Sequence, residues 1–171
     1  VMPDADMENV VNSLTGAAFG SSGERCMALS VAVAVGDEAA DTLIAKMQES
    51  MATLKVGPFS DKSNDFGPVI TKAHQEKVCG YIASAEEQGA TLVVDGRDVQ
   101  VAGYEGGFYV GGTLIDNVTP EMTCYQEEIF GPILPLIPFR DLSAVLARIN
   151  ARPKPLALYV FEKDQAFIDQ A

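Results

Sequence analysis

Short apolar runs alternate with longer segments of helical periodicity along almost the whole chain. The apolar runs contain many β-branched residues and are short, as is typical of strands buried on both faces of a sheet. We expect strands at 28–35, 91–94, 108–115, 133–139 and 156–161, and helices at 7–18, 38–54, 71–88, 141–149 and from Asp164 onward. This alternation indicates an α/β fold with a parallel-type sheet flanked by helices.

Residues with known capping preferences mark the ends of two of these helices. Asp4 or Asp6 precedes the first helix, where a carboxylate can accept hydrogen bonds from the first backbone N–H groups. Thr71 can cap the third helix in the same way, and Gly89 ends it. We therefore expect well-defined boundaries for these two helices.

The composition excludes several classes of protein. The 171 residues suit one domain, and the net charge of −12, with no Lys/Arg cluster, argues against nucleic-acid binding. No apolar run approaches the roughly 18 residues of a membrane helix. Cys26, Cys79 and Cys124 form no Cys-x-x-Cys pair, and one histidine cannot complete a zinc site, so no metal is expected. An odd, widely spaced set of cysteines favours a reducing compartment, the cytoplasm or, after removal of a transit peptide, the mitochondrial matrix.

Cys26 is the candidate nucleophile among the three cysteines. It follows a stretch of glycines and serines between the first helix and a predicted strand, where small residues let a substrate approach the sulfur. Arg25 beside it could favour the thiolate, which is the reactive form of a cysteine. The alternative is a buried, inert thiol, because free cysteines are among the most buried residues.

Four motifs resemble the aldehyde dehydrogenase superfamily and occur in the same order. They are Gly-Ser-Ser-Gly-Glu-Arg-Cys-Met-Ala at 20–28, Pro-Asp-Ala-Asp at 3–6, Leu-Lys-Val-Gly at 54–57 with Phe-Gly-Pro at 66–68, and Glu-Glu-Ile-Phe-Gly-Pro at 127–132. The first is most similar to methylmalonate-semialdehyde dehydrogenases. The resemblance extends over nearly the whole chain and implies the catalytic domain of such an enzyme.

The resemblance assigns roles to four residues of this chain. Cys26 matches the nucleophile that forms a thiohemiacetal and then a thioester, and its backbone N–H would help to stabilise the oxyanion. Glu128 matches the carboxylate that holds the nicotinamide ribose of NAD, and Phe130 matches the aromatic residue that borders the nicotinamide. Arg25 matches an arginine that could pair with a substrate carboxylate. The implied substrate is a small-molecule aldehyde, such as malonate or methylmalonate semialdehyde.

Other parts of the family's apparatus are expected outside residues 1–171. No glycine-rich loop follows a strand, so we expect a thiol-bearing catalytic domain truncated at both ends, without the NAD-binding domain. Residues 1–131 resemble the methylmalonate-semialdehyde branch, whereas those from Ile133 onward resemble the class 3 and coniferyl-aldehyde branch. The first branch releases its acyl group to coenzyme A and the second to water, so the resemblance leaves the acceptor open.

Two other interpretations compete with an active dehydrogenase. The chain could be a catalytically inactive, dehydrogenase-like unit that serves structure or interaction, which the missing cofactor domain favours. It could also be a Cys–His hydrolase or acyltransferase that uses Cys26 and His74. That interpretation predicts that loss of His74 abolishes activity, whereas the dehydrogenase interpretation predicts almost no change and an exposed His74. The family resemblance implies a homo-oligomer, either a dimer or a tetramer.

Overall fold

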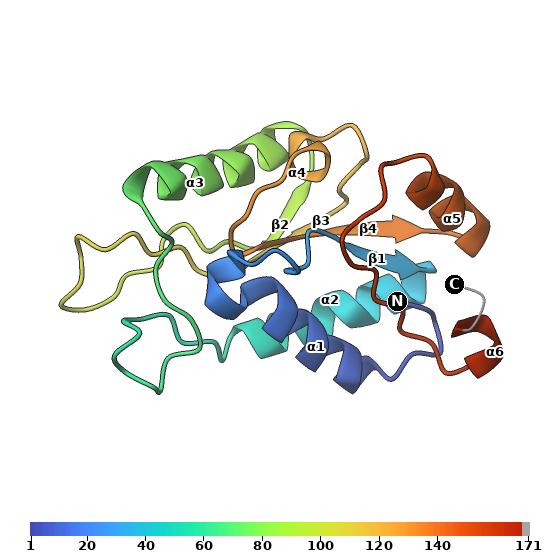
Figure 1. Cartoon of the computed structure of the whole chain (residues 1–171), viewed down its shortest axis with the longest axis horizontal. Helices are drawn as coiled ribbons and strands as arrows, with labels where there is room; N and C mark the ends of the chain where they lie inside the picture. The colour runs from blue at the N-terminus through green and yellow to red at the C-terminus, as the bar shows by residue number, and fades with distance from the viewer. Residues whose placement is uncertain (169–171) are drawn as a thin grey trace.

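A sheet with helices on both faces forms the centre of the protein (Figure 1). The computed structural model describes residues 1–168, in which the sheet has four strands in the order β1-β4-β3-β2. The strands are β1 (Ala32–Val35), β2 (Thr91–Val94), β3 (Thr113–Asp116) and β4 (Ile133–Phe139). The helices are α1 (Met7–Phe19), the 3-10 turn η1 (Gly20–Gly23), α2 (Asp37–Met51), α3 (Lys72–Glu87), α4 (Thr123–Gln126), α5 (Leu142–Asn150) and α6 (Gln165–Ile168).

The central strands run parallel, which confirms the predicted type of fold. β4 pairs in parallel with both β1 and β3, whereas β2 pairs antiparallel with β3 at the sheet's edge. An antiparallel edge strand on a parallel sheet is common in α/β proteins. The predicted strands at 91–94 and 133–139 have the expected bounds, but the one at 28–35 shortens to its last four residues and the one at 108–115 begins later and ends one residue beyond the predicted end.

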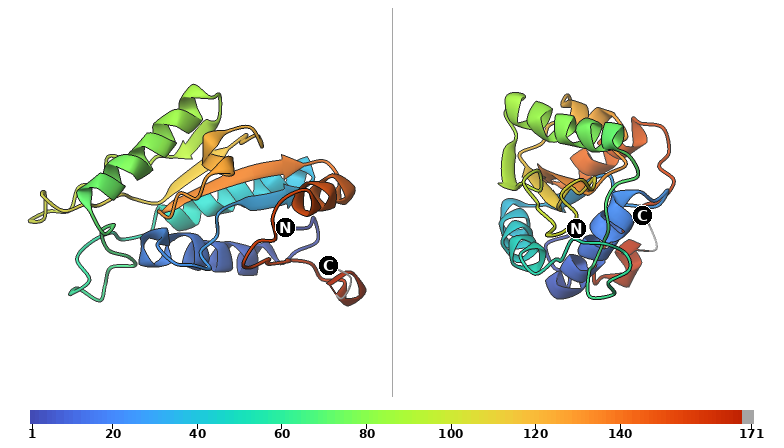
Figure 2. Two further views of the ribbon diagram at one scale, coloured as in Figure 1. Left: turned by 45° about the horizontal axis from the view of Figure 1, so that its top comes forward. Right: turned by 90° about the vertical axis from the view of Figure 1, so that its left-hand side faces the viewer.

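Alternate residues of β4 face two separate hydrophobic cores. Leu134 and Leu136 pack with α1 and α2, and Ile133 and Ile137 pack with α3. Figure 2 shows the same arrangement, with α3 on one side of the sheet and α1 and α2 on the other. Because successive side chains of a strand point to opposite faces, a continuously apolar strand can serve both cores. The apolar character of β4 is thus explained by burial on both sides.

The strand predicted at 156–161 is wrong. Leu156 is 72% exposed and Leu158 is 54% exposed, and the segment lies outside every strand of the described chain. The edge of β1, where it could have paired, is taken by Val1, whose carbonyl accepts a hydrogen bond from Val35. Phe161 bonds to the backbone N–H of Met2 instead. An apolar run without a free strand edge therefore stays outside the sheet.

Helix boundaries follow the predicted caps. The Asp6 carboxylate accepts from the first turn of α1, and the Thr71 hydroxyl accepts from the N–H of His74 in α3. The short helix α4 was not expected. The last helix begins after Asp164 as predicted, but its predicted extension to Ala171 lies outside the described residues.

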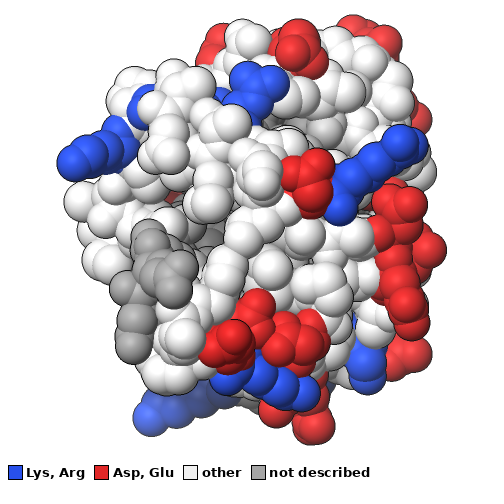
Figure 3. Space-filling view, turned by 90° about the vertical axis from the view of Figure 1, so that its right-hand side faces the viewer, with Lys and Arg blue, Asp and Glu red and all other residues white. Residues whose placement is uncertain are grey.

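Charged side chains are scattered over the surface that contains α5 and α6. On the face drawn in Figure 3, basic residues lie dispersed among acidic ones. None of the helices in residues 1–168 is long and apolar enough to cross a membrane. Within the same residues, no three His, Cys, Asp or Glu side chains are grouped so that they could hold a metal ion.

Candidate active site

The segment before Cys26 makes a tight turn at the end of α1. Ser21, Ser22 and Gly23 all have positive φ angles, of 54°, 56° and 69°. Left-handed backbone costs an L residue roughly 1–2 kcal/mol, so two serines persist there only when other contacts hold them. Ser22 has such a contact, because its buried hydroxyl donates to the carbonyl of Gly67 at 2.7 Å. This bond joins the Cys26 segment to the Phe-Gly-Pro motif.

Arg25 binds the end of α1 that precedes it. Its Nη2 donates to the carbonyl of Gly16 at 2.6 Å and to that of Ala17 at 3.3 Å. The last carbonyls of a helix carry the negative end of its dipole, so a guanidinium there is favourable. A side chain at Gly20 would bring its Cβ within 3.0 Å of this nitrogen. Gly20 therefore leaves room for the arginine.

The Glu-Glu-Ile-Phe-Gly-Pro segment packs directly against this turn. A Cβ placed on Gly23 would overlap the carbonyl oxygen of Gly131, so the two backbones are in direct contact. Phe130, just before, has a φ of 58°, another left-handed residue that is not glycine. Two motifs about a hundred residues apart in sequence therefore meet through their glycines.

The four residues singled out from the sequence line one small pocket of about 40 Å³. Cys26 and Arg25 come from the turn after α1, and Glu128 and Phe130 come from the segment before β4. Cys26 is exposed, and the Phe130 side chain is 40% exposed. A thiol, a carboxylate and an aromatic ring thus share one surface, which suits attack on a carbonyl beside a bound cofactor.

The other two cysteines lie apart from this pocket. Cys79 lies half-buried on α3, and burial raises the pKa of its thiol above the usual range. Cys124 is buried on α4, and burial raises the pKa of its thiol as well. Since the thiolate is the nucleophile, both are poorer nucleophiles than an ordinary cysteine.

His74 is not the exposed residue expected from the sequence. Its side chain is only 17% exposed, and its Nε2 lies 2.6 Å from the carbonyl oxygen of Phe130 and 3.4 Å from a carboxylate oxygen of Glu24. His74 does not line the pocket that contains Cys26, which is unfavourable for a Cys–His pair. The signal was in the sequence: His74 lies one turn before the inward-facing Val78, on the same face of the helix.

Tyr81 is a second residue near the site that sequence reasoning missed. Its hydroxyl donates to the Glu127 carboxylate at 2.6 Å, and this bond raises the pKa of Tyr81 to about 12. The Lys77 ammonium lies 5.5 Å from the centre of its ring. Tyr81 thereby fixes the residue that precedes Glu128.

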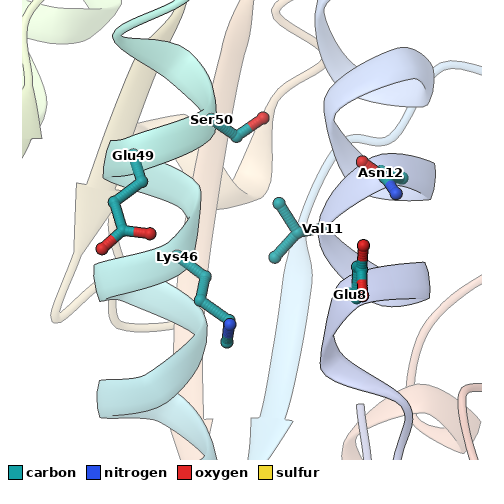
Figure 4. A pocket seen from close by; sticks show the side chains of 6 residues that line it. All are labelled: Glu8, Val11, Asn12, Lys46, Glu49 and Ser50. Carbon is teal, nitrogen blue, oxygen red and sulfur yellow. The ribbon is translucent and has the colours of Figure 1, made fainter.

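A larger hollow, about 270 Å³, lies between α1 and α2 (Figure 4). Its lining residues are Glu8, Val11, Asn12, Lys46, Glu49 and Ser50. The hydroxyl of Ser50 is paired with that of Thr15 at 3.1 Å, and Figure 4 shows Glu49 directed away from α1. Because these six residues include no cysteine and the serine hydroxyl is already paired, the smaller pocket at Cys26 is the better candidate.

Comparison with known proteins identifies the family of this chain. A family model described as "Aldehyde dehydrogenase family" matches residues 1–171. The malonate-semialdehyde dehydrogenase of Pseudomonas aeruginosa is 52% identical over 96% of this chain, which corresponds to 33% of that protein. The human mitochondrial methylmalonate-semialdehyde/malonate-semialdehyde dehydrogenase, named as acylating, is 46% identical over 90% of the chain and 28% of its own length.

Solved structures give the same result. The crystal structure of a methylmalonate-semialdehyde dehydrogenase from Oceanimonas doudoroffii has a TM-score of 0.92 and 59% identity, over 99% of this chain and 35% of that one. A putative methylmalonate-semialdehyde dehydrogenase from Sinorhizobium meliloti, complexed with NAD, has a TM-score of 0.84 and 49% identity over 85% of this chain and 30% of its own.

These similarities cover nearly all of this chain, so the separate class 3 resemblance expected from Ile133 onward finds no support. The chain spans about a third of the length of these relatives. With a family model matched over residues 1–171 and the thiol motif placed in a pocket with Glu128 and Phe130, the chain belongs to the aldehyde dehydrogenase family.

Proposed function

We propose that the protein oxidises an aldehyde with NAD through an acyl-enzyme on Cys26. The observation that carries the proposal is the convergence of Cys26, Arg25, Glu128 and Phe130 on one pocket. These residues come from two segments far apart in sequence, in a chain that belongs to this family. A reaction between a substrate bound to the thiol and a second bound molecule requires that both be held close together, and this convergence provides that.

Cys26 carries the covalent chemistry in this proposal. Its thiolate attacks the aldehyde carbon, so that a carbon–sulfur bond forms and the carbonyl oxygen takes the electron pair. The backbone N–H of Cys26 stabilises this oxyanion, a contribution worth about 3 kcal/mol per donor in other enzymes. Loss of hydride from the same carbon leaves a thioester. An acceptor then attacks the thioester and frees the Cys26 thiolate.

Glu128 and Phe130 have the character and placement to hold NAD, which supplies the hydride acceptor when bound. Glu128 is an exposed carboxylate on the pocket, and a carboxylate can accept hydrogen bonds from both hydroxyls of a ribose. The partly exposed ring of Phe130 offers an apolar face to a flat aromatic group. Both side chains therefore fit the cofactor in the pocket that Cys26 also lines.

Arg25 favours an aldehyde that carries a carboxylate. A guanidinium has five N–H donors, and the two bonds to α1 use a single nitrogen. Arg25 can therefore hold the helix end and still pair with an anionic substrate, which malonate and methylmalonate semialdehyde both are. The names of the relatives support the same substrate class, and "acylating" in several of them favours coenzyme A over water as the acyl acceptor.

The homo-oligomer, dimer or tetramer, stays a prediction from the family resemblance, and the cytoplasmic or matrix location stays a prediction from the cysteine pattern. Light scattering of the natural polypeptide measures the first, and fractionation of the source cells measures the second.

The proposal is tested by NADH production in the natural polypeptide with malonate semialdehyde, with and without coenzyme A. We expect Cys26→Ala to abolish activity and the matched variant Cys79→Ala to retain it. Glu128→Gln should raise the KM for NAD while leaving alkylation of Cys26 by iodoacetamide unchanged. Activity that persists in Cys26→Ala would refute the thiol mechanism. A wild type without NAD turnover would favour a non-catalytic domain.

A further inference from the structure

One face of α3 contacts the Glu127–Gly131 segment at three successive points. His74, Val78 and Tyr81 are spaced i, i+4 and i+7, so they lie on one face of the helix. His74 binds the Phe130 carbonyl, and Tyr81 binds the Glu127 carboxylate. Between them, a Cβ on Gly131 would come within 2.6 Å of Val78. We call these three residues the α3 face. Together they support the segment that contains Glu128 and Phe130.

The hydrogen bond of His74 fixes which nitrogen carries the proton. A carbonyl oxygen only accepts, so Nε2 of His74 must be the donor to Phe130. The carboxylate of Glu24, 3.4 Å from the same nitrogen, also accepts from the backbone N–H of Ile70. Glu24 belongs to the turn that leads to Cys26. His74 thus lies between the two segments that form the pocket.

Phe130 needs such a support because of its backbone conformation. Its φ of 58° lies in the left-handed region that residues other than glycine rarely adopt. The conformation persists only when surrounding contacts hold it, and the bond from His74 acts on the carbonyl of this residue. Without that bond, the Phe130 peptide could rotate toward a more common conformation and carry its ring away from the pocket.

We propose that His74 is a positioning residue. By donating a hydrogen bond to the Phe130 carbonyl, it holds Phe130, and with it Glu128 two positions earlier, in place for the cofactor. This inference rests on the proposed function. This role replaces the expectation that loss of His74 has almost no effect. The role does not include proton transfer at Cys26. A side chain that can donate from a similar place should therefore substitute for it.

The experiment compares His74→Ala, His74→Gln and Gln75→Ala in the natural polypeptide. Gln75→Ala is the matched control, because Gln75 also donates from α3 to a carbonyl, that of Tyr109 at 2.8 Å, but forms no hydrogen bond with the Glu127–Gly131 segment. We expect His74→Ala to raise the KM for NAD about tenfold, which is about 1.4 kcal/mol of binding. His74→Gln and Gln75→Ala should stay within about threefold of the wild type. Alkylation of Cys26 should change less than threefold in all variants.

Three outcomes would overturn the inference. The first is a His74→Ala enzyme with an unchanged KM for NAD. The second is a His74→Gln enzyme as impaired as His74→Ala at an equal melting temperature, since a retained donor would then restore nothing. The third is a wild type that neither binds nor reduces NAD, which refutes the proposed function as well. In the first two outcomes the wild-type enzyme still reduces NAD. They therefore refute the role of His74 without refuting the proposed function.

Discussion

Replacing Gly23 with alanine would test the contact between the two segments of the candidate site. The new Cβ would lie 2.5 Å from the carbonyl carbon of Gly131 and 2.9 Å from the carbonyl oxygen of Ala18, and it would overlap the oxygen of Gly131. All three neighbours are backbone atoms, which cannot turn aside as a side chain can. The segments must therefore separate, or the turn before Cys26 must change its shape.

The expected cost of Gly23→Ala follows from two contributions. A φ of +69° costs an alanine about 1 kcal/mol, and overpacking against fixed backbone adds about 1–3 kcal/mol. The lower entropy of the unfolded alanine chain offsets roughly 0.5–1 kcal/mol. We expect a net loss of about 1–3.5 kcal/mol in the free energy of unfolding. The matched variant is Gly16→Ala in α1, where a Cβ meets no atom within 4 Å, and we expect it to stabilise the protein by about 0.5–1 kcal/mol.

Urea denaturation followed by circular dichroism measures both changes in stability, and NADH production measures the effect on the site. Gly23→Ala should lose most activity even at temperatures where it stays folded, because separation of the segments moves Phe130 relative to Cys26. A Gly23→Ala protein within about 0.5 kcal/mol of the wild type, with equal activity, would show that the close backbone contact is absent.

Three further predictions concern a tyrosine–carboxylate bond, the reactivity of the three cysteines and a helix cap. The pKa of Tyr81 is raised to about 12 by its bond to Glu127, so the stability from this bond is complete below about pH 10 and is lost as the pH rises toward 12. Tyr81→Phe should remove this alkaline loss, as thermal unfolding at pH 9 and pH 11 would reveal; equal pH dependence would contradict it. Because burial raises the pKa of Cys79 and Cys124, peptide mass mapping at pH 8 should find iodoacetamide on the exposed Cys26 first, and equal labelling of all three would refute this. Asp6→Ala removes the cap of α1 and should cost about 1 kcal/mol in urea denaturation, whereas no change would mean that the cap is unimportant.

Local signals in the sequence predicted the helices other than α4, and most of the sheet. Asp6 and Thr71 cap their helices as expected, because a cap depends only on the residues next to it. The strand expected at 156–161 failed for the opposite reason. Pairing depends on a free sheet edge, and residues at the other end of the chain occupy that edge. A run of apolar residues carries no information about such competition.

The candidate site was predictable only in part. Resemblance identified Cys26, Glu128 and Phe130, which line the same pocket. The importance of His74 was missed because its partner, the Phe130 carbonyl, is a backbone group more than fifty residues away. We expected an exposed His74, although its position one turn before Val78 indicates the inward face of the helix; periodicity alone does not show what lies opposite that face.

Cys26 is synthesised long before the strand that completes its surroundings. β1 follows the thiol within a few residues, but its partner β4 comes about a hundred residues later. Closing such a long loop costs entropy before any contact compensates, which makes pairing of this kind a slow step in folding. During translation the thiol therefore emerges without Phe130 or Gly131 beside it. The pocket around Cys26 should consequently form only after residues 127–139 have been synthesised, because they supply both its second wall and the strand that pairs with β1.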